Sequence, residues 1–582
     1  KRDFDISDDT NKLIDERQQL RNVCNWQGVK QKTKEIRKSV RNDRTTQLVQ
    51  NLEECLWYDI KKRKTGFLPN HVKLRKEDGN IARSDERPEV LADHFDKKQW
   101  GIDPNRIRRK STVKIFNYMS DINCMPVTVN ELLLILKKVK NAKSPGPDGI
   151  PLEFFKWMRT ETEHSKEMAR LVCNLLNQCM EEEIMPDDLE LAQVVTLYKK
   201  GNVEDPSNYR PISLLQSLYK IYATILQTRM SREIEEKIWK TQYGFRAKHS
   251  TAEALFITRR IQDFYETHGD KFFMLFLDWE KAFDKVDQEM LLNALWRLNI
   301  PDKLLRILQS FYKAPKFRIK DSEGFSEYRT QKAGIRQGCP LSPYLFILLM
   351  TVIFRDVHTE IDHLIVGRNG DITSEWELLY ADDTMVMGNR AREINIILKQ
   401  IEIESERYNL KLNHDKCFYV GMNGKADIHF KDGKKIEKVD QMTYLGGTIT
   451  SHASRNAEIS SRMSMALGTC RKLKVFWRKT NASTGWKIQV YNAIIISQLI
   501  YGLNTLNITP SIQHRLNSFH MRGLRYILNI DHSYYSHITN EEVIDRMNLA
   551  INEAEALNIT WTQFKVMKET QHEEFKTTKL VG

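Results

Sequence analysis

Hydrophobic and polar residues alternate in different ways along the chain. Within residues 1–65, apolar positions recur at helical spacing among many charged residues, which predicts amphipathic helices. In the centre, an uninterrupted apolar run of strand length, residues 272–277, ends at Asp278. Two shorter apolar runs flank Asp382 and Asp383, and this pattern predicts a hairpin with acidic residues at its turn. Towards the C-terminus the strand patterns disappear and basic helical patterns replace them.

These patterns divide the 582 residues into three predicted parts. Residues 1–125 form a helical, basic N-terminal extension, residues 126–450 a mixed centre of strands and helices, and residues 451–582 a helical C-terminal region. For the N-terminal helices, an RNA-binding face and an ordinary solvated surface explain the charges equally well. The length is sufficient for two to four domains with a large core.

The composition narrows the choice of partners and compartments. The net charge is +13 and the pI about 9.1, which suits a polyanion, although many soluble proteins are also basic. No apolar run reaches the roughly 18 to 20 residues that cross a bilayer, so we expect no membrane partner. The 8 cysteines are scattered and none shows metal-ligand spacing, which predicts reduced thiols, no structural zinc and an intracellular protein.

The acidic residues after the apolar runs suggest a chemistry. If the strands that precede Asp278 and Asp383 lie side by side, three carboxylates including Asp382 converge. Mg²⁺ prefers such an oxygen-rich site, and two ions roughly 3.5–4 Å apart can activate a hydroxyl and stabilise a leaving phosphate. An isolated pair of aspartates is more often an ordinary polar turn. The sequence around the pair therefore has to decide between these interpretations.

That surrounding sequence resembles a known family. The segments FLDWEKAFDKVD (276–287), AGIRQGCPLSPYLF (333–346) and YADD (380–383) are similar to the three core motifs of reverse transcriptases. Their particular variants resemble those of LINE-type (non-long-terminal-repeat) retrotransposons. Five further matches follow in the family's order: KSPGPDGIP (143–151), NYRPISLL (208–215), QYGFRAKHST (242–251), LKLNHDKC (410–417) and YLGG (444–447).

The resemblance implies an α+β right-hand polymerase with fingers and palm in residues 126–450 and a helical thumb and linker in residues 451–582. It implies an RNA-directed DNA polymerase that adds dNTPs to the 3′-hydroxyl of a DNA primer on an RNA template, in target-primed reverse transcription. Asp278, Asp382 and Asp383 are then the catalytic residues that bind two Mg²⁺ ions, for which Mn²⁺ can substitute.

The same resemblance assigns the contacts with the incoming nucleotide. Lys199 and Arg210 match the residues that hold the triphosphate, Gln337 contacts the nucleotide, and Lys416 matches a lysine that protonates the leaving pyrophosphate. Phe283 matches an aromatic residue that excludes a ribose 2′-hydroxyl. The competing interpretations are surface cations for Lys199, Arg210 and Lys416, and a core aromatic residue for Phe283.

Contacts with template and primer are expected from a third set of residues, which consists of Gln242, Gly244, Phe245, Arg246, Gly338, Tyr444, Gly446 and Gly447. Here an aromatic ring can stack on a base, and glycine lets the backbone approach a strand closely. Trp279 departs from the family, because it is larger than the residue expected after the first catalytic aspartate.

Two rival interpretations stay open. One is a group II intron-like or domesticated reverse transcriptase, and the other is a catalytically silent RNA-binding derivative. Because the chain begins at Lys1 rather than Met, we expect a fragment, with any endonuclease located in missing sequence or in another protein. The expected location is the nucleus or the cytoplasm.

Overall fold

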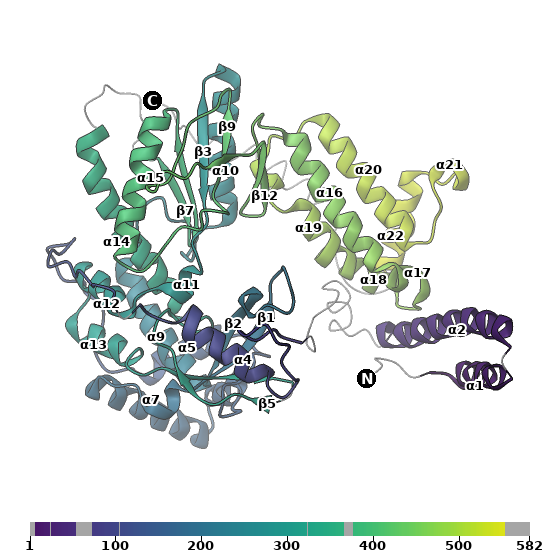
Figure 1. The fold of residues 1–582 in the computed structure, drawn as a ribbon, viewed down its shortest axis with the longest axis horizontal. Coiled ribbons are helices and arrows are strands. Elements are labelled where there is room, and N and C mark those ends of the chain that lie inside the picture. The colour runs from purple at the N-terminus through teal and green to yellow at the C-terminus, as the bar shows by residue number, and fades with distance from the viewer. Residues whose placement is uncertain are drawn as a thin grey trace. The chain divides into compact units, whose positions relative to one another are not determined.

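The computed structural model describes residues 6–23, 25–53, 73–103, 105–322, 324–365 and 376–552. The chain divides into two compact units, drawn in Figure 1. Unit 1 combines Lys1–Leu68 with Ser454–Gly582, and unit 2 is Pro69–Ala453. Parts of the helical regions predicted at both ends, residues 54–65 and 553–582, lie outside the described residues. The predicted domain boundaries near residues 125 and 450 stay predictions, and the first of them falls inside unit 2.

Unit 1 is helical throughout its described residues. From the N-terminal segment come α1 (Asp8–Asn22) and α2 (Trp26–Glu53). From the C-terminal segment come α16 (Arg455–Lys472), α17 (Lys474–Lys479), α18 (Thr484–Val490), η5 (Tyr491–Ile496), α19 (Ser497–Ile500), η6 (Leu503–Thr505), α20 (Pro510–Ile527), α21 (Ser533–Ser536) and α22 (Asn540–Asn552). The side chains of Ser454, Ser483 and Thr509 accept hydrogen bonds from the first turns of α16, α18 and α20, which explains where these helices begin. Buried residues of the C-terminal helices, Trp477 and Tyr491 among them, form the core of the unit.

Unit 2 begins with a segment that packs into its main core. α4 (Arg87–His94) leads into a π-helical turn, η1 (Phe95–Gln99). Phe95 and Trp100 are buried, and the Trp100 ring packs edge-on against Phe317 with 4.6 Å between ring centroids. The end of the predicted N-terminal extension is therefore part of the body that carries the motifs.

A first sheet in unit 2 has the order β2-β1-β4-β5, with β6 also paired to β4. Its strands are β1 (Ala192–Tyr198), β2 (Tyr209–Leu215), β4 (Lys316–Asp321), β5 (Gly324–Phe325) and β6 (Arg329–Thr330). The helical elements that precede or separate these strands include α5 (Val129–Lys138), α6 (Leu152–Lys156), η2 (Trp157–Arg159), α7 (Glu163–Glu182), α8 (Asp187–Glu190), η3 (Pro206–Asn208), α9 (Ser217–Ile234) and η4 (Glu235–Lys237). β1 and β2 form an antiparallel hairpin in which Leu197 lies opposite Arg210.

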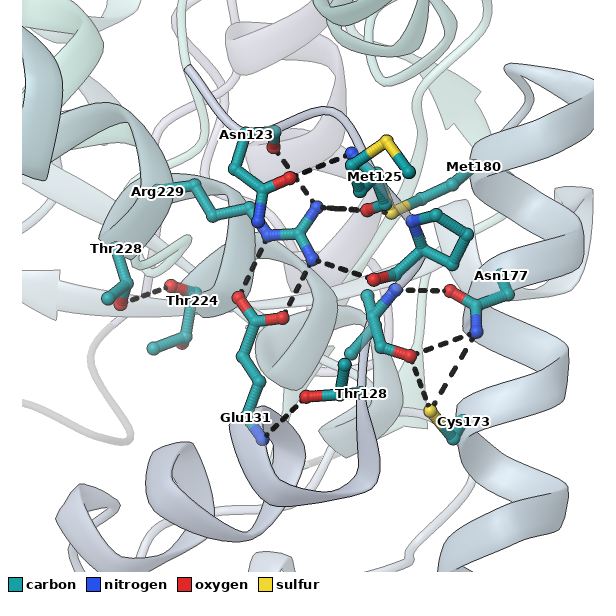
Figure 2. A network of polar contacts seen from close by, with 12 residues as sticks. Asn123, Met125, Thr128, Glu131, Cys173, Asn177, Met180, Thr224, Thr228 and Arg229 are labelled. Carbon is teal, nitrogen blue, oxygen red and sulfur yellow. Dashed lines mark hydrogen bonds and ion pairs between the residues drawn. The ribbon is translucent and has the colours of Figure 1, made fainter. Parts of the chain in front are cut away.

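A buried polar network connects three of these helices, as Figure 2 shows. Arg229 of α9 donates to both carboxylate oxygens of Glu131 in α5, at 2.8 and 2.7 Å. It also donates to the backbone carbonyls of Asn123 and Met125. Asn177 of α7 completes the network from the other side by donating to the Val127 carbonyl.

The second sheet has the order β10-β9-β3-β8-β7 and carries the predicted acids. Its strands are β3 (Phe272–Leu277), β7 (Glu377–Tyr380), β8 (Asp383–Gly388), β9 (Phe418–Met422) and β10 (Glu437–Lys438). Alternate residues of β3 join different cores: Phe273 and Leu275 belong to the main core, whereas Phe272 and Met274 pack with residues of α10. Because β3 is covered on both faces, its sequence is apolar without interruption.

Helices cover the second sheet, and α14, α15 and α10 stand beside its strands in Figure 1. The remaining elements of unit 2 are α10 (Thr251–His268), α11 (Ala282–Lys285), α12 (Gln288–Arg297), α13 (Asp302–Ser310), α14 (Ser342–Ile365), α15 (Ala391–Glu406), β11 (Gln441–Tyr444) and β12 (Gly447–Thr450). The α+β fold expected of a right-hand polymerase is confirmed. Within the described parts of the chain, no helix has the length and apolar character needed to span a membrane.

Candidate active site

The strand register brings the three predicted aspartates to one end of the second sheet. β3 and β8 are antiparallel, and their last pair is Leu277 with Thr384. Asp278 and Asp383 therefore come directly after this pair, on neighbouring strands. Asp382 lies in the tight turn from β7 to β8, where Ala381 has a φ of 57°. The hairpin with acids at its turn is thus confirmed, and so is its position beside the strand that ends at Asp278.

Neighbouring residues hold the start of this acidic site in place. The Trp279 side chain is buried, and its Nε1 donates to Thr384 Oγ1 at 3.0 Å. The backbone N–H of Asn413 donates to the Asp278 carbonyl at 2.8 Å. Trp279, the large residue that departs from the family pattern, therefore ties the end of β3 to β8 beside the acids. The loop that precedes Lys416 holds the backbone of Asp278 through Asn413.

The three carboxylates influence one another electrostatically. Asp382 and Asp383 are exposed side chains, yet the surrounding protein limits their hydration. This loss of hydration, together with repulsion by Asp382 and Asp278, raises the pKa of Asp383 to about 6. The pKa of Asp382 is also raised, mainly by lost hydration, while Arg210 acts in the opposite direction. Carboxylates that resist ionisation in this way favour a cation as a neighbour.

Basic residues predicted to bind the nucleotide lie near these acids. Burial, together with Arg210 and Lys416, lowers the pKa of Lys199, while Asp278 raises it. The Nζ of Lys416 lies 3.5 Å from Asp278 Oδ2. Lys199 is therefore close enough to Arg210, Lys416 and Asp278 for their charges to interact, and Arg210 acts in the same way on Asp382.

A cavity of about 480 Å³ opens beside the acids. Asp278 and Asp382 line it together with Lys199, Arg210 and Lys416. Its basic lining residues are Lys199, Lys200, Arg210, Lys281, Arg336 and Lys416, and its acidic lining residues are Asp278, Asp284 and Asp382. An excess of cations around two of the candidate catalytic acids suits a polyanionic ligand such as a triphosphate.

Phe283 and Gly338, which the sequence assigned to ligand contacts, both line this cavity. Phe283 lines the cavity, and its ring stacks on Phe346 with 4.7 Å between centroids. Gly338 also lines it, with a φ of 129°. A Cβ at Gly338 would lie 2.3 Å from the carbonyl oxygen of Ser213, so a larger residue would push the loop away from β2. Ser213 donates its backbone N–H to the Gln337 carbonyl at 2.7 Å, which fixes the loop to the first sheet.

Some residues predicted to contact the template have side chains that point into the protein and bond to other residues of it. Gln242 is 1% exposed, and its Oε1 accepts hydrogen bonds from the backbone of Gly244 and Ala381. Arg246 donates to Glu235 at 2.8 Å. For these two side chains the structure differs from the expectation. Gln242 braces the acidic turn at Ala381, and Arg246 ties its own loop to Glu235. Phe245 is 50% exposed and lines the cavity, so it remains available for a ligand.

The predicted primer contact differs in the same way. Tyr444 is 4% exposed, and its ring packs against Phe276 with 5.3 Å between centroids. Its hydroxyl has no hydrogen-bond partner among the described residues. A Cβ at Gly447 would lie 2.9 Å from Leu255, whereas Gly446 has a φ of 76°. Tyr444 therefore packs against β3 through Phe276. The primer contacts of this segment stay a prediction.

Several cavity residues were not assigned a ligand role from the sequence, among them Gln99, Lys281 and Asp284. Lys281 and Asp284 lie in the first core motif, and Gln99 lies far upstream. Asp284 is buried, and Gln99 reaches it across 185 positions of sequence. A separation of this size leaves no signal in local spacing.

No group of three Asp, Glu, His or Cys side chains is close enough to form a ready-made metal site within the described residues. The predicted trio of Asp278, Asp382 and Asp383 is therefore not gathered as tightly as bound ions would require.

A family model described as reverse transcriptase (RNA-dependent DNA polymerase) matches residues 198–449, which include all three aspartates. The chain contains a reverse transcriptase domain. The mobile element jockey of Drosophila melanogaster encodes an RNA-directed DNA polymerase that is 24% identical over 78% of this chain and 50% of that protein. The Pol polyprotein of the R2DM element from the same species is 25% identical over 56% of this chain and 30% of its own length. The chain thus spans about half the length, or less, of these curated relatives.

These relatives agree with the expected LINE-type retrotransposon family. Among solved structures, the telomerase of Candida albicans, in complex with a fragment of telomeric RNA, aligns with a TM-score of 0.38 and 12% identity. That alignment covers 66% of this chain and 68% of the telomerase. The reverse transcriptase domain therefore rests on the family match and on the named relatives.

Proposed function

We propose that the chain is an RNA-directed DNA polymerase that adds dNTPs to the 3′-hydroxyl of a DNA primer on an RNA template. The observation that carries this proposal is the cavity that Asp278 and Asp382 line together with an excess of cations. Both aspartates also lie within the segment that matches the reverse transcriptase family. As the biological setting we propose target-primed reverse transcription, because the relatives are retrotransposon polymerases.

The donor set at the end of β3 and β8 fits divalent ions. Carboxylate oxygens are the ligands that Mg²⁺ prefers, and the raised pKa of Asp383, which lost hydration and two neighbouring carboxylates cause, indicates unbalanced negative charge. Asp278, Asp382 and Asp383 would hold the ions. When bound, two such ions supply the charge that activates the primer hydroxyl and stabilises the leaving pyrophosphate.

The chain's own residues have separate tasks around this centre. Lys199 and Arg210 bind oxygens of the triphosphate, for which the guanidinium offers a bidentate grip. Phe283 excludes the 2′-hydroxyl of a ribonucleotide, supported from behind by Phe346. Lys416, whose Nζ lies 3.5 Å from Asp278 Oδ2, gives a proton to the leaving pyrophosphate.

Primer extension tests the proposal. The purified chain receives Mg²⁺, an RNA template with an annealed DNA primer, and either dNTPs or NTPs. We expect extension with dNTPs, and a loss of at least about 1,000-fold in the Asp382→Ala/Asp383→Ala variant, since removal of major electrostatic groups typically costs this much. Lys479→Met in unit 1, far in sequence from the cavity residues, is the control for a change of surface charge.

The outcomes separate the alternatives. A folded chain that binds template–primer but never extends it would support a silent RNA-binding derivative. Extension at equal rates with NTPs would contradict the role of Phe283. Extension that survives in the double aspartate variant would overturn the assignment of the catalytic acids.

A further inference from the structure

One wall of the cavity is held together by a chain of hydrogen bonds around a buried carboxylate. Asp284 is 5% exposed and accepts from Gln99 Nε2 at 2.9 Å, Trp100 Nε1 at 3.0 Å and Gln337 Nε2 at 2.8 Å. The three donors come from the end of η1 and from the loop before α14. The buried carboxylate holds the three donor side chains in place, because a donor that moved away would lose a strong, charged acceptor.

Lys281 extends this network to the cavity. Its Nζ donates to Oε1 of Gln99 at 2.9 Å, so the amide of Gln99 bridges Lys281 and Asp284. Lys281 has a φ of 49°, and its carbonyl accepts the backbone N–H groups of Asp284 and Lys285. The backbone turn and the Gln99 bond together restrict where the ammonium group can lie.

The ammonium group of Lys281 retains capacity for a ligand. An ammonium group has three donors, and the bond to Gln99 uses one of them. Among the described residues no carboxylate lies within ion-pair distance of its Nζ, although Lys281 is partly buried and lines the same cavity as Lys199 and Arg210. Asp284, Glu280 and Asp205 act on this cation only from a distance. A partly desolvated cation that lacks a direct ion pair gains from an anionic oxygen in the cavity.

We propose that Lys281 is a third cationic ligand for the phosphates of the incoming nucleotide, and that Gln99 and Asp284 position it together with Gln337. The proposal rests on the polymerase function proposed above, because it assigns a further residue to the same nucleotide site. Asp284 and Gln99 are positioning residues, since they act through Lys281 and Gln337.

Lys285 offers a matched control on the same short helix. Its Nζ donates to the carbonyl of Lys98, next to Gln99, at 2.8 Å. Burial lowers the pKa of Lys285 as it does that of Lys281. Lys285 does not line the cavity, so Lys285→Met removes a comparable tether without removing a cation from the nucleotide site.

The experiment measures steady-state KM and kcat for one dNTP, and inhibition by inorganic tripolyphosphate, which has neither base nor sugar. For Lys281→Met we expect KM to rise, and inhibition by tripolyphosphate to weaken, by about 10- to 100-fold, the usual loss of a hydrogen bond to a charged group. Lys281→Arg should recover most of this loss, because it keeps the charge. Gln99→Met should raise KM with a smaller effect on tripolyphosphate.

Three outcomes decide between success and failure. Unchanged KM and unchanged tripolyphosphate inhibition in Lys281→Met, with an active wild type, would overturn the inference but not the polymerase function. Equal losses in Lys281→Met and Lys285→Met would also overturn it, because the tether rather than the cation would then matter. No extension by the wild-type chain would refute the proposed function itself, and tripolyphosphate binding, followed by calorimetry, would still test Lys281.

Discussion

Arg229 and the aspartates at the ends of β3 and β8 all place charge inside unit 2, but their surroundings are opposite. Arg229 is 3% exposed, and its guanidinium meets Glu131 and several backbone carbonyls (Figure 2). Asp383 has two other carboxylates as neighbours, and its pKa rises to about 6 because lost hydration and their repulsion disfavour its charge. The first region uses its charge for stability, whereas the second retains unbalanced charge that a ligand can neutralise.

The largest effect on folding is expected from breaking the satisfied network. Arg229→Met should lower the free energy of unfolding by about 3–5 kcal/mol, because it leaves Glu131 and the carbonyls of Asn123 and Met125 without their partner. Denaturant unfolding measures the loss. Arg232→Met, an exposed change on the same helix α9, should stay within about 0.5 kcal/mol of wild type. A loss below about 1 kcal/mol for Arg229→Met would show that the network contributes little.

Of these two regions, the acidic site could be predicted from the sequence, whereas the network around Arg229 could not. The aspartates, Lys199 and Arg210 occupy motif positions, and an acid after an apolar strand is visible in the sequence itself. The network of Arg229 combines residues of α5, α7 and α9 with backbone carbonyls, none of which has a distinctive local pattern. Contacts made by backbone atoms of distant segments become apparent only in the folded chain.

The same limit applies within the candidate site. Gln242 and Tyr444 were assigned to template and primer by their motifs, yet both side chains are buried and support the sheet. A motif shows that a position matters, but it does not show whether the side chain faces a ligand or the core. For Trp279 the sequence revealed only an unusual size, whereas the structure supplies a partner, Thr384.

That partner provides the next test. The buried bond from Trp279 Nε1 to Thr384 Oγ1 is a satisfied contact beside the unbalanced acids. A double-mutant cycle with Trp279→Phe and Thr384→Val should give a coupling energy of about 1 kcal/mol in unfolding. Each single variant should lower kcat for primer extension more than it raises KM, because the bond aligns β3 with β8. Additive effects, with zero coupling, would show that the bond has no energetic role.

The smallest expected effect concerns the charge of Asp383 and its dependence on pH. Its pKa is about 6 in the folded chain, against roughly 3.9 in an unfolded one. The folded state therefore binds more protons between these values, and stability falls as pH rises from about 4 to about 6. Asp383→Asn removes this titration, so in EDTA the variant should be the more stable protein at pH 7.5 and should lose about half of that advantage at pH 5.

Thermal unfolding at both pH values measures this difference, and Glu266→Gln, an exposed change on α10, serves as the comparison for a surface carboxylate. The shift should be small, because the Asp383 side chain is accessible to solvent and water screens its neighbours. With Mg²⁺ in place of EDTA, the advantage of Asp383→Asn at pH 7.5 should shrink or reverse, since an ion that binds only the folded wild type stabilises it. A pH-independent difference, unaffected by Mg²⁺, would mean that the acids at the ends of β3 and β8 are no more strained than the satisfied network around Arg229.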